Sequence, residues 1–356
     1  EALCGFCDIR FAKPPESVLK RPDNIMNAGW FDGGTLNYAE HLLRHEGAGE
    51  ALVFSAEDGG RRTLSFDELR DAVAGVAAGL KRAGVVKGDR VGGYLPNCPE
   101  AIVAMLATTS IGAIWSSCSP DFGVDGVVER FGQIEPKVLF CAAGHQYNGK
   151  RHESRSKVRE IVERIESIRR VVIVPYPDPD PRLDDIRGAV AWSDFTANDA
   201  TDPAFTPLPF DHPVYILYSS GTTGAPKCIT HGAGGTLLQH LKELVLHVNL
   251  RRSDRICYYT TCGWMMWNWL VSSLAAGATV LLYDGSPFHA RESVLWEMAE
   301  RERATVFGAS AKYLAMCEKR GLRPGRTQSL GALRTILSTG SPLAPSSYDW
   351  VYRDVK

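Results

Sequence analysis

Residues 218–227 read YSSGTTGAPK and bring serine and threonine hydroxyls, two glycines and a lysine into one short segment. The segment follows residues 214–217 (VYIL), an apolar run that predicts a buried strand. Small residues let backbone N–H groups approach an anion, hydroxyls add hydrogen-bond donors, and lysine adds a positive charge. The spacing therefore predicts a loop that binds phosphate groups.

Other interpretations of this segment can be weighed from the residues alone. A Walker loop is excluded, because Pro226 rather than glycine precedes Lys227 and Cys228 rather than serine or threonine follows it. A plain polar turn is the alternative, since most clusters of serine, threonine and glycine are turns. The ordered spacing after a strand favours the phosphate loop. His231, just beyond it, could contact phosphate or simply pack.

The composition predicts an ordinary globular protein without a general affinity for polyanions. The chain has 356 residues, 44% hydrophobic and 23% charged, with a formal net charge of −1. This length exceeds one simple core, so we expect two packed subdomains. A near-neutral charge gives no pull toward nucleic acid or anionic membranes, so an anionic ligand must be held by local groups.

The cysteines and the longest uncharged stretch indicate a soluble cytoplasmic protein. The nine cysteines lie mostly within apolar patterns, as reduced intracellular cysteines do. Cys4 and Cys7 lack the partners of a zinc site, and no histidine spacing predicts a metal centre. Residues 258–283 carry no charge, but polar residues and Gly277 interrupt them. We expect a buried helix leading into a buried strand there rather than a membrane span.

Strands and helices alternate along the chain. Ser65 and Glu68 predict a capping box, and Asn97 with Glu100 is expected to cap the helix that follows. The fold class is therefore α/β, with two stacked parallel sheets covered by helices on both faces. We expect an irregular extension over 1–34, a first βα subdomain over 35–200 and a second over 201–356, joined by Pro/Asp-rich connectors. Ligands should bind beyond the carboxyl ends of the strands.

The chain stops at Lys356 in what reads as the middle of an element. No capping signal or change of composition accompanies this end, so we expect a fragment.

Several segments together resemble one enzyme family. YSSGTTGAPK is similar to the phosphate-binding signature of the adenylate-forming acyl-CoA synthetase superfamily. Residues 231–243 (HGAGGTLLQHLKE), 260–270 (TTCGWMMWNWL), 281–288 (LLYDGSPF) and 30–43 (WFDGGTLNYAEHLL) look like the acetoacetyl-CoA synthetase family rather than its acetyl-CoA relatives. The resemblance covers nearly the whole chain and about the first half of the family's length.

The resemblance implies a two-step reaction with ATP, Mg²⁺ and coenzyme A. A carboxylic acid, here acetoacetate, would react with ATP to give acyl-adenylate and pyrophosphate, and the acyl group would pass to the thiol of coenzyme A. The ATP phosphates would be held by Ser219, Ser220, Gly221, Thr222, Thr223, Gly224 and Lys227. Among these, Lys227 and Thr223 would act in catalysis by stabilising the charge on the departing pyrophosphate.

The resemblance also assigns the other sides of the site. The adenine would lie beside Gly340, Ser341 and Pro342, and the acyl pocket would be lined by Trp264, Met265, Met266, Asn268 and Thr339. Asn268 is the candidate for contact with the second oxygen of a keto acid, whereas plain core packing is the alternative for this aromatic and methionine stripe. Coenzyme A would pass Ala309 and Lys150, although Lys150 could equally be solvated.

Two parts of the family pattern lie beyond Lys356: the acidic motif that helps to bind Mg²⁺ and ribose, and the small C-terminal domain with its lysine. We therefore expect the chain alone to be catalytically silent and assign no metal ligands within it. Another short acid, such as acetate, propionate or a different 3-oxo acid, is the alternative substrate, and a non-catalytic nucleotide-binding protein is the alternative function. No nucleic acid or membrane partner is expected, and a monomer or a homodimer would both fit.

Replacing Lys227 by alanine should weaken ATP use by ~2–4 kcal/mol, the range for a lost oxyanion donor, because a charge facing the phosphates disappears. The fold should be retained. In the complete protein, acid-dependent ATP–pyrophosphate exchange and thermal melting measure the two effects. Unfolding of Lys227→Ala would instead favour the structural turn.

Overall fold

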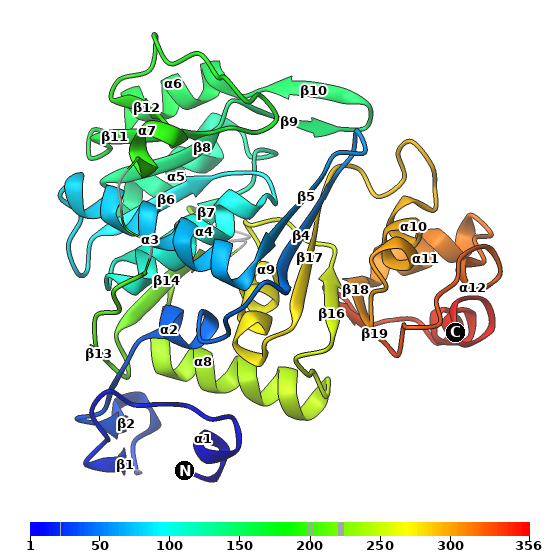
Figure 1. Ribbon diagram of the computed structural model, residues 1–356, viewed down its shortest axis with the longest axis horizontal. Coiled ribbons are helices and arrows are strands. Elements are labelled where there is room, and N and C mark those ends of the chain that lie inside the picture. Colours follow the sequence, from blue (N-terminus) through cyan, green and yellow to red (C-terminus); the bar gives the residue numbers. More distant parts are fainter. Residues whose placement is uncertain (22, 198–199, 201, 220–223) are drawn as a thin grey trace.

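The computed structural model describes residues 1–21, 23–197, 200, 202–219 and 224–356. Two mainly parallel sheets dominate the described part, as Figure 1 shows. Each sheet has one antiparallel strand at an edge. This architecture confirms the α/β class with parallel sheets.

The larger sheet has seven strands in the order β12-β11-β8-β6-β7-β14-β15. Helices separate most of its strands along the chain, and its inner strands are apolar because both faces of the sheet are covered. They are β6 (Arg90–Tyr94), β7 (Ile114–Cys118), β8 (Val138–Ala142), β11 (Arg170–Val174), β12 (Ala189–Ala191), β14 (Pro213–Tyr218) and the antiparallel β15 (Cys228–Gly232).

The smaller sheet has six strands in the order β19-β18-β16-β17-β4-β5. They are β4 (Glu50–Ala56), the antiparallel β5 (Arg61–Ser65), β16 (Arg255–Tyr258), β17 (Thr279–Asp284), β18 (Val306–Ser310) and β19 (Thr335–Thr339). Each sheet contains strands from both sides of residue 200. In the smaller sheet, β4 and β5 come before residue 200 and the other four strands come after it. In the larger sheet, β14 and β15 come after residue 200 and the other five strands come before it.

The helices form three layers around the two sheets. The layer between the sheets packs on strands of both and contains α3 (Phe66–Arg82), α4 (Pro99–Ser110), α8 (Ala233–Leu241) and α9 (Met265–Val271). The outer face of the larger sheet carries α5 (Val124–Ile134) and α6 (Arg155–Arg164). The outer face of the smaller sheet carries α10 (Val294–Arg301) and α11 (Ala311–Lys319).

Short elements complete the described chain. They are α1 (Ala2–Phe6), β1 (Ser17–Lys20), η1 (Ile25–Asn27), β2 (Gly29–Asp32), β3 (Thr35–Leu36), α2 (Tyr38–Leu42), β9 (Gly144–Tyr147), β10 (Lys150–Glu153), α7 (Trp192–Thr196), β13 (Leu208–Pro209), η2 (Lys242–His247), η3 (Ser272–Ala276), α12 (Pro324–Thr327), α13 (Pro345–Trp350) and η4 (Val351–Val355).

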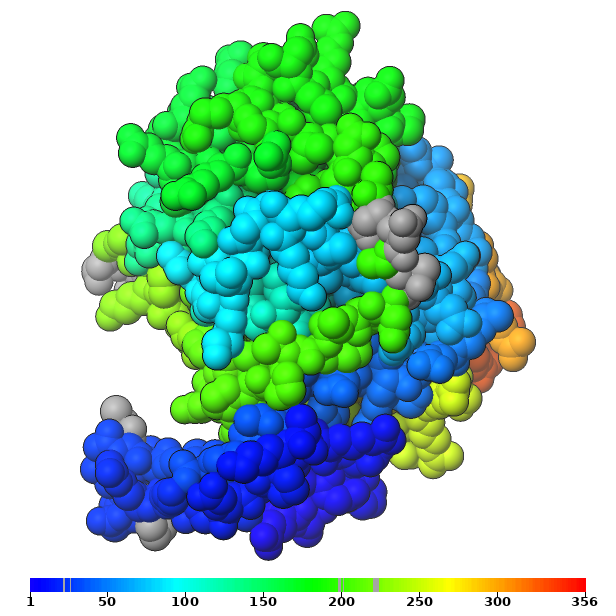
Figure 2. Space-filling model, turned by 60° about the vertical axis from the view of Figure 1, so that its left-hand side comes forward, coloured from blue at the N-terminus to red at the C-terminus, as the bar shows by residue number. Residues whose placement is uncertain are grey.

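The N-terminal segment, drawn in dark blue in Figure 2, lies along one end of the body. Its ribbon of β1 and β2 leads into β3, which pairs with β13. The rings of Phe31 and Phe210 stack with their centroids 4.5 Å apart. The segment expected to be irregular thus contains short elements, and aromatic packing against the segment around β13 attaches it to the rest of the protein.

The starts of α3 and α4 show one correct and one wrong capping prediction. The Ser65–Glu68 capping box is present at α3. At α4, however, the N-cap is Cys98 and no side chain caps the helix. The prediction for Asn97 and Glu100 is wrong because both have other partners: the Glu100 carboxylate accepts two hydrogen bonds from Arg62 of β5.

Residues 258–283 run from β16 through α9 and η3 into β17 within the core. In the described ranges, no helix combines the length and the apolar character that crossing a bilayer requires.

A buried carboxylate, Glu302, ties together three arginines at the smaller sheet. Its side chain is 3% exposed. It accepts hydrogen bonds from Nε of Arg61 and Nε of Arg301, each at 2.9 Å. Arg255 lies beside it at 3.4 Å. Burial alone would raise the pKa of Glu302, but the bonds from Arg61 and Arg301 outweigh burial and hold the pKa below its usual value of 4.5.

This lowered pKa predicts a component of acid unfolding. Because the folded pKa lies below the unfolded one, the stabilisation is fully present above pH 4.5 and is lost as the pH falls through the folded value. Glu302→Gln should lose ~1–3 kcal/mol of unfolding free energy at neutral pH, since it leaves the arginines poorly paired. It should also show a flatter acid dependence in urea titrations between pH 7 and pH 3. An unchanged acid dependence would contradict this assignment.

Candidate active site

The predicted phosphate loop connects β14 and β15 as a hairpin. Its base is closed by two hydrogen bonds: the N–H of Ser219 donates to the carbonyl of Lys227 at 3.0 Å, and the N–H of Lys227 donates to Oγ of Ser219 at 3.2 Å. Lys227 is exposed. Gly224 has φ of +119° and open space where a Cβ would stand. Ser220, Gly221, Thr222 and Thr223 lie outside the described residues.

The neighbouring His231 belongs to β15, which the sequence analysis did not predict. Its ring lies 5.0 Å from that of Tyr215 in β14. Burial lowers the pKa of His231. The return strand was missed because its residues (CITHG) lack an apolar alternation, and only the register of the hairpin pairs them with β14.

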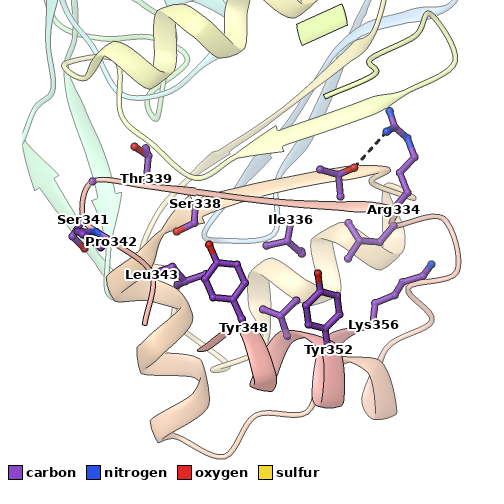
Figure 3. A pocket seen from close by; sticks show the side chains of 14 residues that line it. Arg334, Ile336, Ser338, Thr339, Ser341, Pro342, Leu343, Tyr348, Tyr352 and Lys356 are labelled. Carbon is purple, nitrogen blue, oxygen red and sulfur yellow. Dashed lines mark hydrogen bonds between the residues drawn. The ribbon is translucent and has the colours of Figure 1, made fainter. Parts of the chain in front are cut away.

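The predicted adenine residues lie at the end of β19. Gly340, Ser341 and Pro342 are exposed and, with Thr339, line one end of a cavity of about 810 Å³. Figure 3 shows Ser341 and Pro342 at this end, and Tyr348 and Tyr352 rising from α13 and η4 along the cavity. Gly340 has φ of +93°. The chain can therefore turn sharply and present its backbone where β19 ends.

The predicted acyl-pocket residues divide between the surface and the core. Trp264 is 59% exposed and Met265 46%, so plain core packing does not account for them. Met266 is half-buried. Asn268 is buried, and within the described chain neither polar atom of its side chain has a hydrogen-bond partner. The structure thus leaves Trp264 and Met265 accessible to a ligand, whereas Asn268 is buried.

The two residues predicted for coenzyme A lie on different elements. Ala309 is fully buried in β18 and pairs with Ser338 of β19. Lys150 is exposed at the start of β10.

The β9–β10 hairpin was not predicted, although its signal is in the sequence. Asn148 and Gly149 connect the strands, and an Asn-Gly pair is a strong indicator of a two-residue hairpin turn. Both have positive φ, at 54° and 74°. The Glu57 carboxylate accepts hydrogen bonds from the N–H groups of Asn148 at 2.9 Å and Gly149 at 2.6 Å. The turn is thereby anchored to the end of β4.

A second cavity, of about 510 Å³, lies where the two sheets meet. We call it the inter-sheet cavity. Its walls are the carboxyl ends of strands from both sheets: Pro96 and Asn97 after β6, Ser119, Pro120 and Asp121 after β7, Tyr259, Thr260 and Thr261 after β16, and Tyr283, Asp284 and Gly285 at β17. The β9–β10 hairpin covers it with His145 and His152, whose rings lie 5.0 Å apart.

The predicted site residues share this edge of the structure. β14, β18 and β19 run parallel to the other strands of their sheets. Ser219 therefore follows a carboxyl end in the larger sheet, whereas Ala309 and Thr339 lie at carboxyl ends in the smaller one. This is the edge at which open α/β sheets bind ligands.

Asn97 joins the two sheets at the inter-sheet cavity. Its side chain is 3% exposed. Its Oδ1 accepts a hydrogen bond from the indole N–H of Trp267 at 2.9 Å. Its Nδ2 donates to the carbonyl oxygens of Tyr283 at 3.3 Å and Thr260 at 3.4 Å. One amide after β6 of the larger sheet thus holds the ends of β16 and β17 and the helix α9 in place. The sequence analysis missed this role because it predicted that Asn97 caps α4.

Asp284 is the cavity's most strongly perturbed carboxyl group. Oδ2 of Asp284 accepts a hydrogen bond from the hydroxyl of Tyr176 at 2.8 Å. Burial raises the pKa of Asp284 to about 7 despite this bond. Opposite it, burial and the neighbouring His152 lower the pKa of His145. In the described ranges, no group of three or more His, Cys, Asp or Glu residues could hold a metal ion.

These features define an α/β domain with a ligand site at the carboxyl edge of its parallel sheets. The chain belongs to the AMP-binding enzyme family, whose model matches residues 40–356.

Particular relatives are similar over almost the whole chain. The acetoacetyl-CoA synthetase of Danio rerio is 48% identical over 99% of this chain and 54% of its own length. The malonamoyl-CoA synthetase vrtB of Penicillium aethiopicum is 41% identical over 98% of this chain and 52% of its own. The solved acetoacetyl-CoA synthetase from Streptomyces lividans aligns with a TM-score of 0.93 and 44% identity, over 99% of this chain and 54% of that one. The chain therefore spans about half the length of the relatives it matches.

Asn97→Ala should destabilise the fold by ~1–3 kcal/mol, because it leaves the indole N–H of Trp267 buried without an acceptor and two carbonyls without a donor. Asn97→Asp should fall below wild type as well, because it keeps the acceptor but loses both donors. Urea-induced unfolding measures the effect, with Asn27→Ala at an exposed position as the control. Equal unfolding midpoints for wild type and Asn97→Ala would contradict the bridging role.

Proposed function

We propose that the complete protein is an acid–thiol ligase that activates acetoacetate with ATP and transfers the acetoacetyl group to coenzyme A. The observation that carries the proposal is the hydroxyl, glycine and lysine loop at the carboxyl end of β14, in a chain similar to acetoacetyl-CoA synthetases over almost its whole length. The known function of those relatives supports the substrate, and the loop supports the use of ATP.

In this proposal the loop holds the ATP phosphates. Ser219, Gly224 and Lys227 contribute from its described part, and Ser220, Gly221, Thr222 and Thr223 from the remainder. The exposed Lys227 is free to extend toward an anion, and a positive charge there stabilises the pyrophosphate as it leaves. Thr223 assists as a hydrogen-bond donor.

The base and the acid bind on the smaller sheet's side. Gly340, Ser341 and Pro342 offer backbone and an apolar edge to adenine at the mouth of the larger cavity. Trp264, Met265, Met266 and Thr339 wall the acyl group, and Asn268 supplies a polar contact behind them. The paired positions of Ala309 and Ser338 bring the end of β18 beside that of β19, so coenzyme A would approach near the same edge.

Coenzyme A would place its nucleotide at the exposed Lys150 and its pantetheine arm toward Ala309. Mg²⁺ would enter with the ATP phosphates. Because the described residues contain no cluster of metal ligands, no step is assigned to the ion here. The nine cysteines are all free thiols, eight of them buried, which supports a reducing compartment and hence a cytoplasmic location.

A second substrate is favoured by the fungal relative. Malonamate and acetoacetate both carry a carbonyl on the third carbon, and the relative named for malonamoyl-CoA is 41% identical to this chain. The pocket would then recognise that carbonyl and discriminate less between a terminal methyl and a terminal amide.

Acid-dependent ATP–pyrophosphate exchange by the complete protein tests the proposal. Acetoacetate should support the fastest exchange, malonamate should follow, and acetate and butyrate should be poor because they lack the third-carbon carbonyl. Activity with acetate well above that with acetoacetate would contradict the assigned substrate. Nucleotide binding without exchange for any of the four acids would favour a non-catalytic nucleotide-binding protein.

A further inference from the structure

Asp284 is placed at the convergence of the two sheets and has no cationic partner. It is the last residue of β17, and its side chain lines the inter-sheet cavity. Tyr176, after β11 of the other sheet, donates a hydrogen bond to Oδ2. Across the described residues, no lysine, arginine or histidine lies within ion-pair distance of this carboxylate. Asp284 is thus held in position without being neutralised.

The groups around Asp284 come from several elements. Glu57 after β4 and Asp121 after β7 are acidic and raise the pKa of Asp284 further, whereas the hydroxyl of Tyr176 and the N–H of Asn97 lower it. The remaining titratable groups that face it or line the same cavity are Cys98, Cys262, Tyr147, Tyr259, Tyr283, His145, His152 and Lys157. Its surroundings therefore favour a carboxyl group that exchanges its proton near neutral pH.

The walls of the cavity belong to segments that also carry residues assigned to different substrates, although those residues do not themselves line it. One wall is the β9–β10 hairpin, which carries Lys150. Another wall is Thr260 and Thr261, only a few residues before the exposed Trp264 of the acyl pocket. If coenzyme A enters beside the hairpin, its thiol would reach Asp284 in this cavity.

We propose that Asp284 is the base that removes the proton from the thiol of coenzyme A in the second half-reaction. The inference rests on the proposed function. The S–H bond breaks and its proton moves to a carboxylate oxygen of Asp284. The sulfur electron pair forms the C–S bond with the acyl carbon of the adenylate, and the bond from that carbon to the phosphate oxygen breaks, so AMP leaves as the anion. Tyr176 is a positioning residue that orients the carboxylate.

The chemistry of the two groups is matched. An alkyl thiol has a pKa of about 8.5, and an ordinary aspartate, with a pKa of about 3.9, is too weak a base to deprotonate it efficiently. A carboxyl group whose pKa lies near the working pH is still partly ionised there and is a stronger base than an ordinary carboxylate, which is the compromise that general-base catalysis favours.

The test separates the two half-reactions in the complete protein. ATP–pyrophosphate exchange reports adenylate formation, which involves no thiol. Single-turnover transfer from preformed acyl-adenylate to coenzyme A reports the second step. For Asp284→Asn, the ratio of the transfer rate to the exchange rate should fall by ~10²-fold, within the usual range for a lost general base. The rise of the wild-type transfer rate around pH 7 should also disappear.

Two further variants distinguish a base from a structural link. Tyr176→Phe removes a bond that lowers the pKa of Asp284, so the pH at which transfer rises should move upward. Asp121→Asn makes the same chemical change in the same cavity but removes a neighbour that raises the pKa of Asp284. The transfer rate should therefore still rise with pH, but the rise should occur at a lower pH. A purely structural role would shift neither profile, and Tyr176→Phe decides the question if Asp284→Asn fails to fold.

The experiments distinguish a failure of the proposed function from a failure of the proposal for Asp284 alone. Absence of exchange in the wild type with every acid would overturn the proposed function, and the inference with it. Normal wild-type exchange together with an unchanged transfer profile in Asp284→Asn would overturn the inference alone.

Discussion

A buried amide, Asn97, helps to set the geometry on which the site depends. Two parallel sheets, each covered by its own helices, could pack in many relative orientations, because apolar contact between layers is not directional. Asn97 adds direction, since its oxygen accepts from α9 and its nitrogen donates to the carbonyl of Tyr283 near the end of β17 and to that of Thr260 just after β16. Each bond is made where water is excluded, so a slip of one sheet against the other leaves polar groups unsatisfied. The carboxyl ends of both sheets therefore converge on one crevice.

The charged side chains are unevenly placed, so a nearly neutral chain can still present a local positive charge to an anion. The lysine of the β14–β15 hairpin is exposed, while Arg61 and Arg255 pair with the buried Glu302 and Arg62 pairs with the buried Glu100. The inter-sheet cavity is lined by Asp121 and Asp284 together with His145, His152 and Lys157. Phosphate groups are thus favoured on one side and a proton acceptor on the other. Local placement, and not net charge, determines what each side can bind.

Much of the fold was predictable because it depends on local patterns. Strand–helix alternation gave the α/β class, and Ser65 with Glu68 gave the start of α3. The misses came from long-range pairing: β15 follows from its register with β14, and β4 and β5 join a sheet whose other strands come much later. The β9–β10 hairpin had a local signal in Asn148 and Gly149 that was overlooked. For the site, the sequence placed the loop, but Asn97 looked like a helix cap and Asp284 like an ordinary strand end, because their roles require both sheets.

The central claim is that nucleotide binds at the carboxyl edge between the β14–β15 hairpin and the end of β19. A crystal structure of the complete protein with a non-hydrolysable ATP analogue tests this most directly. The account predicts density for the triphosphate against Ser219 and Lys227, with the adenine beside Gly340, Ser341 and Pro342. Nucleotide density elsewhere, with the hairpin contacting no anion, would contradict it.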